Sequence, residues 1–134
     1  MSQDLFYAMA TTDLAEVALA SGDFSQSQQW LLKSIEPSKG HFRRSIIFLL
    51  TLAGYLAFSP DSSAEDAARF LGAVDALSER SGAPLGSLYL ARIQKHATKI
   101  RGTVSESQWQ IAYQDGKSWG KETAFQHASR VLAI

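Results

Sequence analysis

The apolar residues of this 134-residue chain recur at the spacing of α-helices rather than that of β-strands. Three stretches repeat apolar side chains at intervals of three and four residues, and no stretch alternates at period two. The stripes comprise Ala67, Phe70, Leu71, Val74 and Leu77; Leu85, Leu88, Tyr89, Ile93, Ala97 and Ile100; and Ala124, Phe125, Ala128, Val131 and Leu132. This periodicity predicts an all-α fold.

The helices are separated by breaks at Pro37, Pro60 and Pro84, each with serine or glycine nearby. We expect about seven helices, at roughly 4–21, 24–36, 42–58, 64–80, 85–101, 104–115 and 121–133. Short connections favour antiparallel hairpins, over about 4–36, 42–80 and 85–115, followed by a C-terminal capping helix at 121–133. The length of the chain is that of a single domain.

Capping residues mark several of the expected helix ends. Asp23 and Thr103 each precede a Gln or Glu by three residues, which is the spacing of a reciprocal N-cap. Gly82, Gly102 and Gly116 follow helical stripes, where a left-handed glycine commonly ends a helix.

The most apolar segment, 46–58, is too short to cross a membrane. It spans thirteen residues, whereas a bilayer crossing needs about 20. We therefore expect a buried core helix and no membrane partner. The N-terminal residues lack the basic and apolar regions of a signal peptide, and the chain has no cysteine. Both features fit a reducing, cytoplasmic location, and the lack of cysteine also excludes disulfides and thiol chemistry.

The charge balance argues against direct contact with nucleic acid. Thirteen basic residues offset thirteen acidic ones, so the chain lacks the basic excess that neutralises phosphates. Arg92, Lys95 and Lys99 share one helical face, and on a neutral domain we interpret that face as solvated.

No pattern in the sequence points to catalysis. His41, His96 and His127 are far apart and lack metal-ligand spacing. Neither a phosphate-binding glycine loop nor a nucleophile elbow is present. We expect a non-enzyme with no catalytic, cofactor-binding or metal-binding residue.

The first hairpin carries the pattern of a helical repeat. Residues 13–37 contain a leucine–small pair, a glycine–aspartate–aromatic turn and a later small residue, namely Leu14, Ala15, Gly22, Asp23, Phe24 and Ser27. Intervals of four and three residues occur twice, at Ser27, Leu31 and Ser34 and at Ala67, Leu71 and Val74. The pattern resembles the tetratricopeptide repeat, which implies hairpins stacked as a short right-handed superhelix.

The second half of the chain resembles a region found near the end of certain bacterial regulators. The similar residues are those of 67–77, 82–85 and Tyr89, then Trp109, Ala112, Tyr113, Gly116, Lys117, Ala124 and Ala128. The resemblance is to the C-terminal helical arrays of LuxR-type and related ATPase-coupled transcriptional activators, which tend to have Ser or Thr at the position of Gly120. It implies a non-catalytic protein-interaction or sensory domain of such a regulator, with any DNA reading left to another module.

The repeat resemblance also implies a binding surface, because the first helix of each pair lines the inner face of such arrays. The corresponding residues are Met9, Thr12, Glu16 and Leu19; Ile47, Leu50, Gly54 and Ala57; and Gln94 and Thr98. The second set is almost wholly apolar, so this face either becomes core or forms a groove that needs an occupant.

A groove would take a helical or extended peptide, another module of the same parent chain, or a second copy in a homodimer. The alternative function is a small-ligand sensor, in which the inner face closes over an effector.

Overall fold

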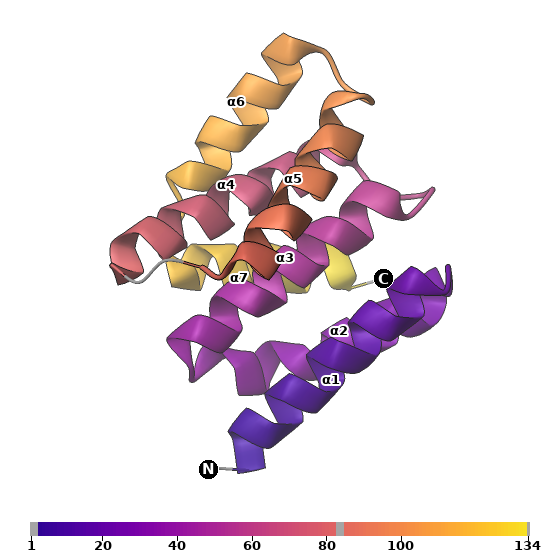
Figure 1. The fold of residues 1–134 in the computed structure, drawn as a ribbon, viewed down its shortest axis with the longest axis vertical. Helices are drawn as coiled ribbons and strands as arrows, with labels where there is room; N and C mark the ends of the chain where they lie inside the picture. Colours follow the sequence, from indigo (N-terminus) through magenta and orange to yellow (C-terminus); the bar gives the residue numbers. More distant parts are fainter. Residues whose placement is uncertain (1–2, 83–84, 134) are drawn as a thin grey trace.

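The computed structural model describes residues 3–82 and 85–133, which form seven α-helices and no strand (Figure 1). This confirms the all-α, seven-helix prediction. The helices are α1 (Gln3–Ala20), α2 (Phe24–Lys39), α3 (Phe42–Phe58), α4 (Ala64–Ser81), α5 (Ser87–Arg101), α6 (Glu106–Lys117) and α7 (Lys121–Leu132).

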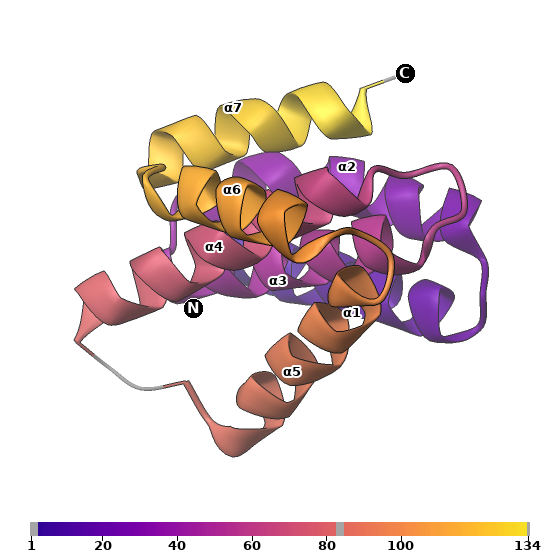
Figure 2. The ribbon, with the colours of Figure 1, turned by 90° about the horizontal axis from the view of Figure 1, so that it is seen from above.

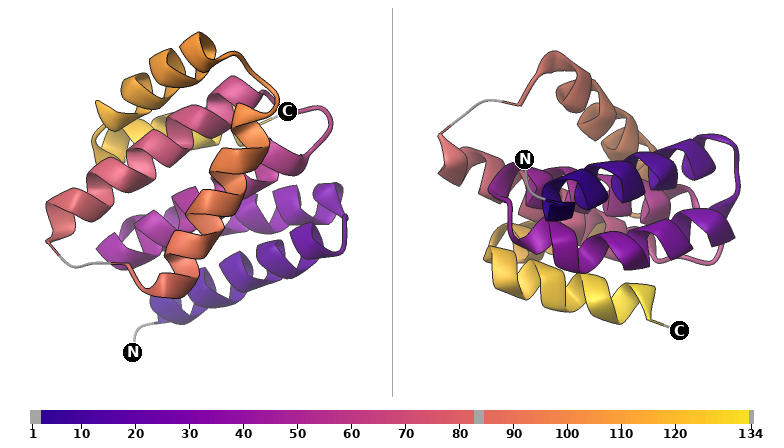
Figure 3. Two further views of the ribbon diagram at one scale, coloured as in Figure 1. Left: turned by 45° about the horizontal axis from the view of Figure 1, so that its top comes forward. Right: turned by 90° about the horizontal axis from the view of Figure 1, so that it is seen from below.

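Helix α3 is the centre of the molecule. Twelve of its seventeen residues are buried, and it contacts α1, α2, α4, α5 and α7. Helices α5 and α7 lie on opposite sides of α3 (Figure 2), an arrangement that the view from below repeats (Figure 3). Within the described part of the chain, no helix has the length and apolarity needed to span a bilayer. The burial of residues 45–56 makes the apolar segment of α3 part of the core, as expected.

The α1–α2 hairpin closes through small residues. Gly22 turns the chain with a φ of +79°, and Asp23 accepts a hydrogen bond from the backbone N–H of Gln26 at 3.1 Å. The buried Ser27 hydroxyl donates to the backbone carbonyl of Ala15 at 3.0 Å. A small residue at position 27 thus lets the two helices approach closely, as the repeat pattern predicts.

Helices α4 and α6 touch backbone to backbone at two glycines. A Cβ on Gly72 would lie 2.1 Å from the carbonyl oxygen of Tyr113, and a Cβ on Gly116 would lie 1.7 Å from that of Arg69. Gly116 is therefore a contact residue inside α6, and the prediction that it ends a helix in a left-handed conformation is wrong.

The expected hairpin over 85–115 is not a closely packed pair. Helix α6 packs chiefly along α4, and α5 and α6 meet only near their connection. Figure 2 shows the two helices diverging. The physical reason is the pair of glycines described above, which lets α6 approach α4 more closely than side chains would allow. The right-handed superhelix stays a prediction.

Three other local expectations change. Pro37 lies inside the last turn of α2, where its missing N–H removes only one terminal hydrogen bond. Ser105, not Thr103, caps α6, because its side chain pairs reciprocally with residue 108. Gly82 ends α4 with a φ of +69° as predicted, whereas Gly102 has a right-handed φ of −74°.

We predict that Gly116→Ala destabilises the fold because its methyl group would force α6 away from α4. The overlap with a backbone carbonyl outweighs the gain of about 1 kcal/mol in helix propensity, so the net loss should be roughly 2 kcal/mol. Urea unfolding measures this directly. The matched control is Gly40→Ala, where a Cβ would meet no atom within 4 Å. Equal stability of the two variants would contradict the close contact.

Candidate functional site

The apolar residues expected on the inner face of α3 are core residues. Ile47, Leu50 and Gly54 are buried, and Ala57 is half-buried. They do not line an open groove. Of the two outcomes left open by the sequence, core or groove, the structure shows core.

Helix α5 covers this face. Figure 3 shows α5 crossing α3, and the contact is close at Gly54, where a Cβ would lie 2.7 Å from Nε2 of His96. The imidazole of His96 also meets the ring of Phe58 edge to face, with centroids 5.8 Å apart. Gln94 and Thr98 are exposed on α5 and take no part in the contact. The occupant of the predicted groove is therefore a helix of this chain.

The inner-face residues of α1 have three different roles. Thr12 is buried, and its hydroxyl hydrogen-bonds that of Ser34 on α2 at 2.6 Å. Met9 and Leu19 are half-buried. Glu16 forms an ion pair with Arg92 of α5, whose guanidinium also donates to the hydroxyl of Thr51 at 3.2 Å. This pair ties α5 to α1 across the face of α3.

A cleft of about 380 Å³ remains open beside this ion pair. It lies where the ends of α1 and α3 meet the middle of α5, and we call it the α1–α5 cleft. Its lining includes Glu16, Leu19, Phe24, Phe58, Arg92, Lys95 and His96. Two of the ten residues predicted for the inner face, Glu16 and Leu19, thus border an accessible space.

His96 is the most unusual polar residue of this cleft. It is 5% exposed, and neither ring nitrogen has a hydrogen-bond partner among the described residues. Burial lowers the pKa of His96, and together with the nearby positive charges of Arg92 and Lys95 it brings that pKa to about 4. The ring is therefore neutral at pH 7. The sequence carried a signal of this burial, since His96 continues the apolar stripe of Tyr89, Ile93 and Ile100 at spacings of four and three.

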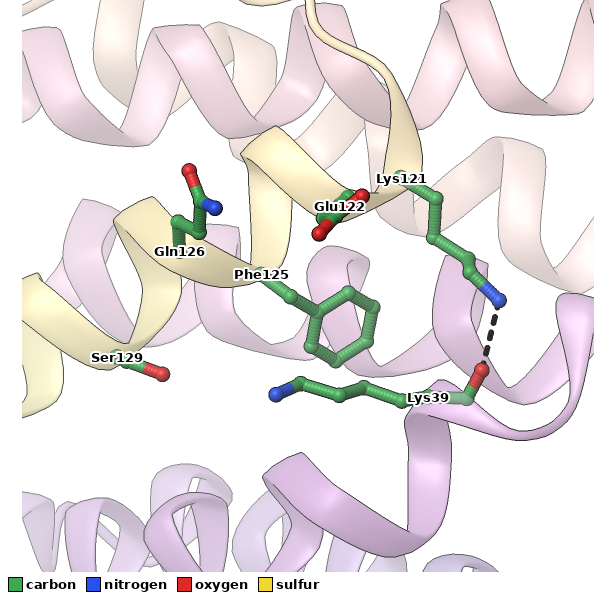
Figure 4. A pocket seen from close by; sticks show the side chains of 6 residues that line it. All are labelled: Lys39, Lys121, Glu122, Phe125, Gln126 and Ser129. Atoms are coloured by element: carbon green, nitrogen blue, oxygen red, sulfur yellow. Dashed lines mark hydrogen bonds between the residues drawn. The ribbon is translucent and has the colours of Figure 1, made fainter.

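A larger hollow of about 610 Å³ lies between the end of α2 and the start of α7 (Figure 4). The ammonium group of Lys121 donates to the backbone carbonyl of Lys39 at 2.7 Å, which caps the end of α2. The Lys39 side chain lies along the Phe125 ring. None of the buried polar atoms that lack a partner in the described residues belongs to this hollow. Its lysines have structural roles, and it is a weaker candidate than the α1–α5 cleft.

The outer face of α1 is a second candidate surface. Large apolar side chains are exposed along it: Phe6 (60%), Tyr7 (48%), Leu14 (42%) and Val17 (66%). Their spacing places them on one side of the helix, away from the small residues that pack on α2. We call these four residues the α1 stripe. Sequence reasoning missed it, although the spacing of the four residues was readable.

Ionisable pairs elsewhere are structural. The Tyr113 hydroxyl donates to Asp75 across the α4–α6 contact. Burial raises the pKa of Asp75, and burial together with this hydrogen bond raises the pKa of Tyr113. In the part of the chain that the structure covers, no three metal-ligating side chains gather.

Comparisons of this chain with protein-family models, with curated proteins and with solved structures found no match. The two resemblances seen in the sequence therefore stay predictions.

We predict that lowering the pH from 7 to 5 destabilises the protein through His96. The unfolded chain binds the proton near the ordinary pKa of about 6.5, whereas the folded chain binds it only near about 4. The neutral imidazole of His96 therefore adds to the free energy of unfolding in full above about pH 6.5, and this contribution is lost as the pH falls toward 4. The expected loss between pH 7 and 5 is roughly 2 kcal/mol.

Urea unfolding of the wild type and of His96→Leu at both pH values measures this contribution. The leucine variant should lose less stability on acidification, because other titrating groups are common to both proteins. His41→Gln, on a half-buried residue between α2 and α3, should behave as the wild type. The same pH dependence in wild type and His96→Leu would show that the imidazole titrates like one in water.

Proposed function

We propose that this chain is a non-catalytic domain that binds a protein partner, and that the α1 stripe is the docking surface. The observation that carries the proposal is the exposure of four large apolar side chains on one face of a helix at the edge of the bundle.

The stripe leaves α1 with one unpartnered apolar side. A helix that is apolar on all sides is normally buried on all sides. The opposite side of α1 is satisfied by α2, against which Ala8, Thr11 and Ala15 are buried. The exposed parts of the four stripe residues amount to roughly 400 Å², which is the size of patch that often has a function.

The charges of α1 indicate the chemistry of the partner. The helix carries Asp4, Asp13 and Glu16 and has no lysine or arginine. A helical segment with an apolar face flanked by Lys or Arg complements this surface. A second copy of α1 fits less well because it would bring like charges together, so the proposed occupant is a basic amphipathic helix of another protein or module.

This role agrees with the resemblance of the second half to the helical arrays of bacterial LuxR-type and related regulators. We propose that the domain acts as an interaction region of such a regulator in the cytoplasm. A chain without cysteine fits this reducing compartment, where proteins rarely contain disulfides. The partner helix then belongs to another module of the same parent chain or to a separate protein.

The test uses a synthetic amphipathic helix built of leucine and lysine as the probe, with a leucine–glutamate helix of the same pattern for comparison. We predict that the lysine probe binds more tightly in fluorescence anisotropy. Val17→Asp should weaken its binding about tenfold, because a charge replaces the most exposed apolar side chain of the stripe.

The matched control is Ile111→Asp on α6, since Ile111 is 69% exposed and lies outside the stripe. This variant should bind the probe as the wild type does. Equal losses in Val17→Asp and Ile111→Asp, or equal binding of the lysine and glutamate probes, would overturn the proposal.

A further inference from the structure

The geometry points to a second binding site: the α1–α5 cleft takes a small carboxylate with an apolar body. This inference does not depend on the α1 stripe, because the cleft involves a different face of α1.

Positive charge gathers at the cleft. Arg92 and Lys95 of α5 line it. The ammonium groups of Lys95 and Lys99 lie 5.6 and 5.9 Å from the centroid of the Phe58 ring, which also lines the cleft. The only carboxylate in the lining is that of Glu16, which is paired with Arg92. Lys95 has no ion pair among the described residues and is exposed. A positively charged cleft attracts negative ions, so the ligand that fits it is an anion.

The rest of the lining is apolar and suits the body of such a ligand. Leu19 and Ala20 come from α1, Phe24 from the start of α2, and Phe58 from the end of α3. The volume of about 380 Å³ is at the lower end of the range for small-molecule sites. An apolar wall opposite a cationic wall favours a molecule with one carboxylate and a compact ring or chain.

His96 provides a second observation, on the electrostatics of the cleft. Its imidazole is buried at the edge of the cleft and both nitrogens lack partners in the described structure. A buried polar group without a partner is costly and rare in a folded protein. The groups facing it are Arg92 and Lys95 on its own helix and apolar or uncharged residues of α3, with Glu16 of α1 reached through Arg92. A bound carboxylate would offset those two positive charges.

The cluster of basic residues on α5 thereby gains a role. The sequence alone predicts a solvated face, but in the fold Arg92 and Lys95 line a concave space with apolar walls, and Lys99 lies near Phe58 at its border. A solvated basic face needs no apolar wall, whereas a site for a carboxylate with an apolar body needs both cationic and apolar residues.

The experiment uses phenylacetate, its uncharged amide phenylacetamide and the cationic phenethylamine as probes. Binding is followed by NMR on backbone amides and histidine rings up to about 10 mM, above the Kd of about 1 mM expected for ten heavy atoms. We expect phenylacetate to shift signals of residues lining the cleft, with smaller shifts from the amide and none from the amine. Phenylacetate should also raise the pKa of His96 by about 1, while the ring signals of His41 should not shift.

Three variants locate the site. Lys95→Gln should weaken phenylacetate binding several-fold, because it removes the unpaired cation. Ala20→Phe keeps every charge but fills the cleft, so it should abolish binding. Lys33→Gln on the exposed side of α2 removes a cation elsewhere and should leave binding unchanged.

The inference fails if phenylacetate shifts no cleft signal, if the amine binds as well as the carboxylate, or if Ala20→Phe binds normally. Equal effects of Lys95→Gln and Lys33→Gln would show only general charge attraction and would also overturn it. Since none of these measurements involves the α1 stripe, their failure would leave the proposed protein-binding function standing.

Discussion

Helix α3 is apolar on nearly every side, and the arrangement of the other helices follows from the need to cover it. A helix of this kind is stable in water only when neighbours surround it. The hairpin of α1 and α2 covers one flank and α4 the other, while α5 and α7 close the two remaining faces (Figures 2 and 3). Phe48 of α3 stacks on Phe125 of α7 at 5.2 Å, and Gly54 receives His96 of α5. The face that a repeat array would present to a guest is thus filled from within.

Covering α3 in this way has consequences for what stays exposed. Helix α5 contributes only His96 and Ile100 to the fully buried set, so it closes the face of α3 incompletely and leaves the α1–α5 cleft beside the Glu16–Arg92 pair. Helix α1 lies at the edge and contacts chiefly α2, so the α1 stripe faces solvent. The α1–α5 cleft and the α1 stripe therefore have the same cause: five helices surround α3, and these outer helices are themselves only partly covered.

Much of the fold was predictable because local patterns decide it. Periodicity, proline breaks and capping residues together located all seven helices, and Asp23, Ser27 and Gly82 act as their local chemistry predicts. Gly116 did not follow its local pattern. The residues around Gly116 suggest a helix end. Its role in the contact between α6 and α4 becomes visible only in the fold, where Gly72 of α4 makes a similar close approach. The site was less predictable for the same reason: which helix covers Gly54 depends on packing between segments about forty residues apart, which periodicity does not encode.

The central claim is that α5 fills the inner face of α3, and the packing of His96 against Gly54 is its most direct sign. A nuclear Overhauser measurement between the proton on Cε1 of His96 and the α protons of Gly54 tests it. The structure predicts a strong cross-peak, because the imidazole lies in van der Waals contact with that glycine. Absence of the cross-peak, together with a His96 ring that titrates like a solvated imidazole, would contradict the placement of α5.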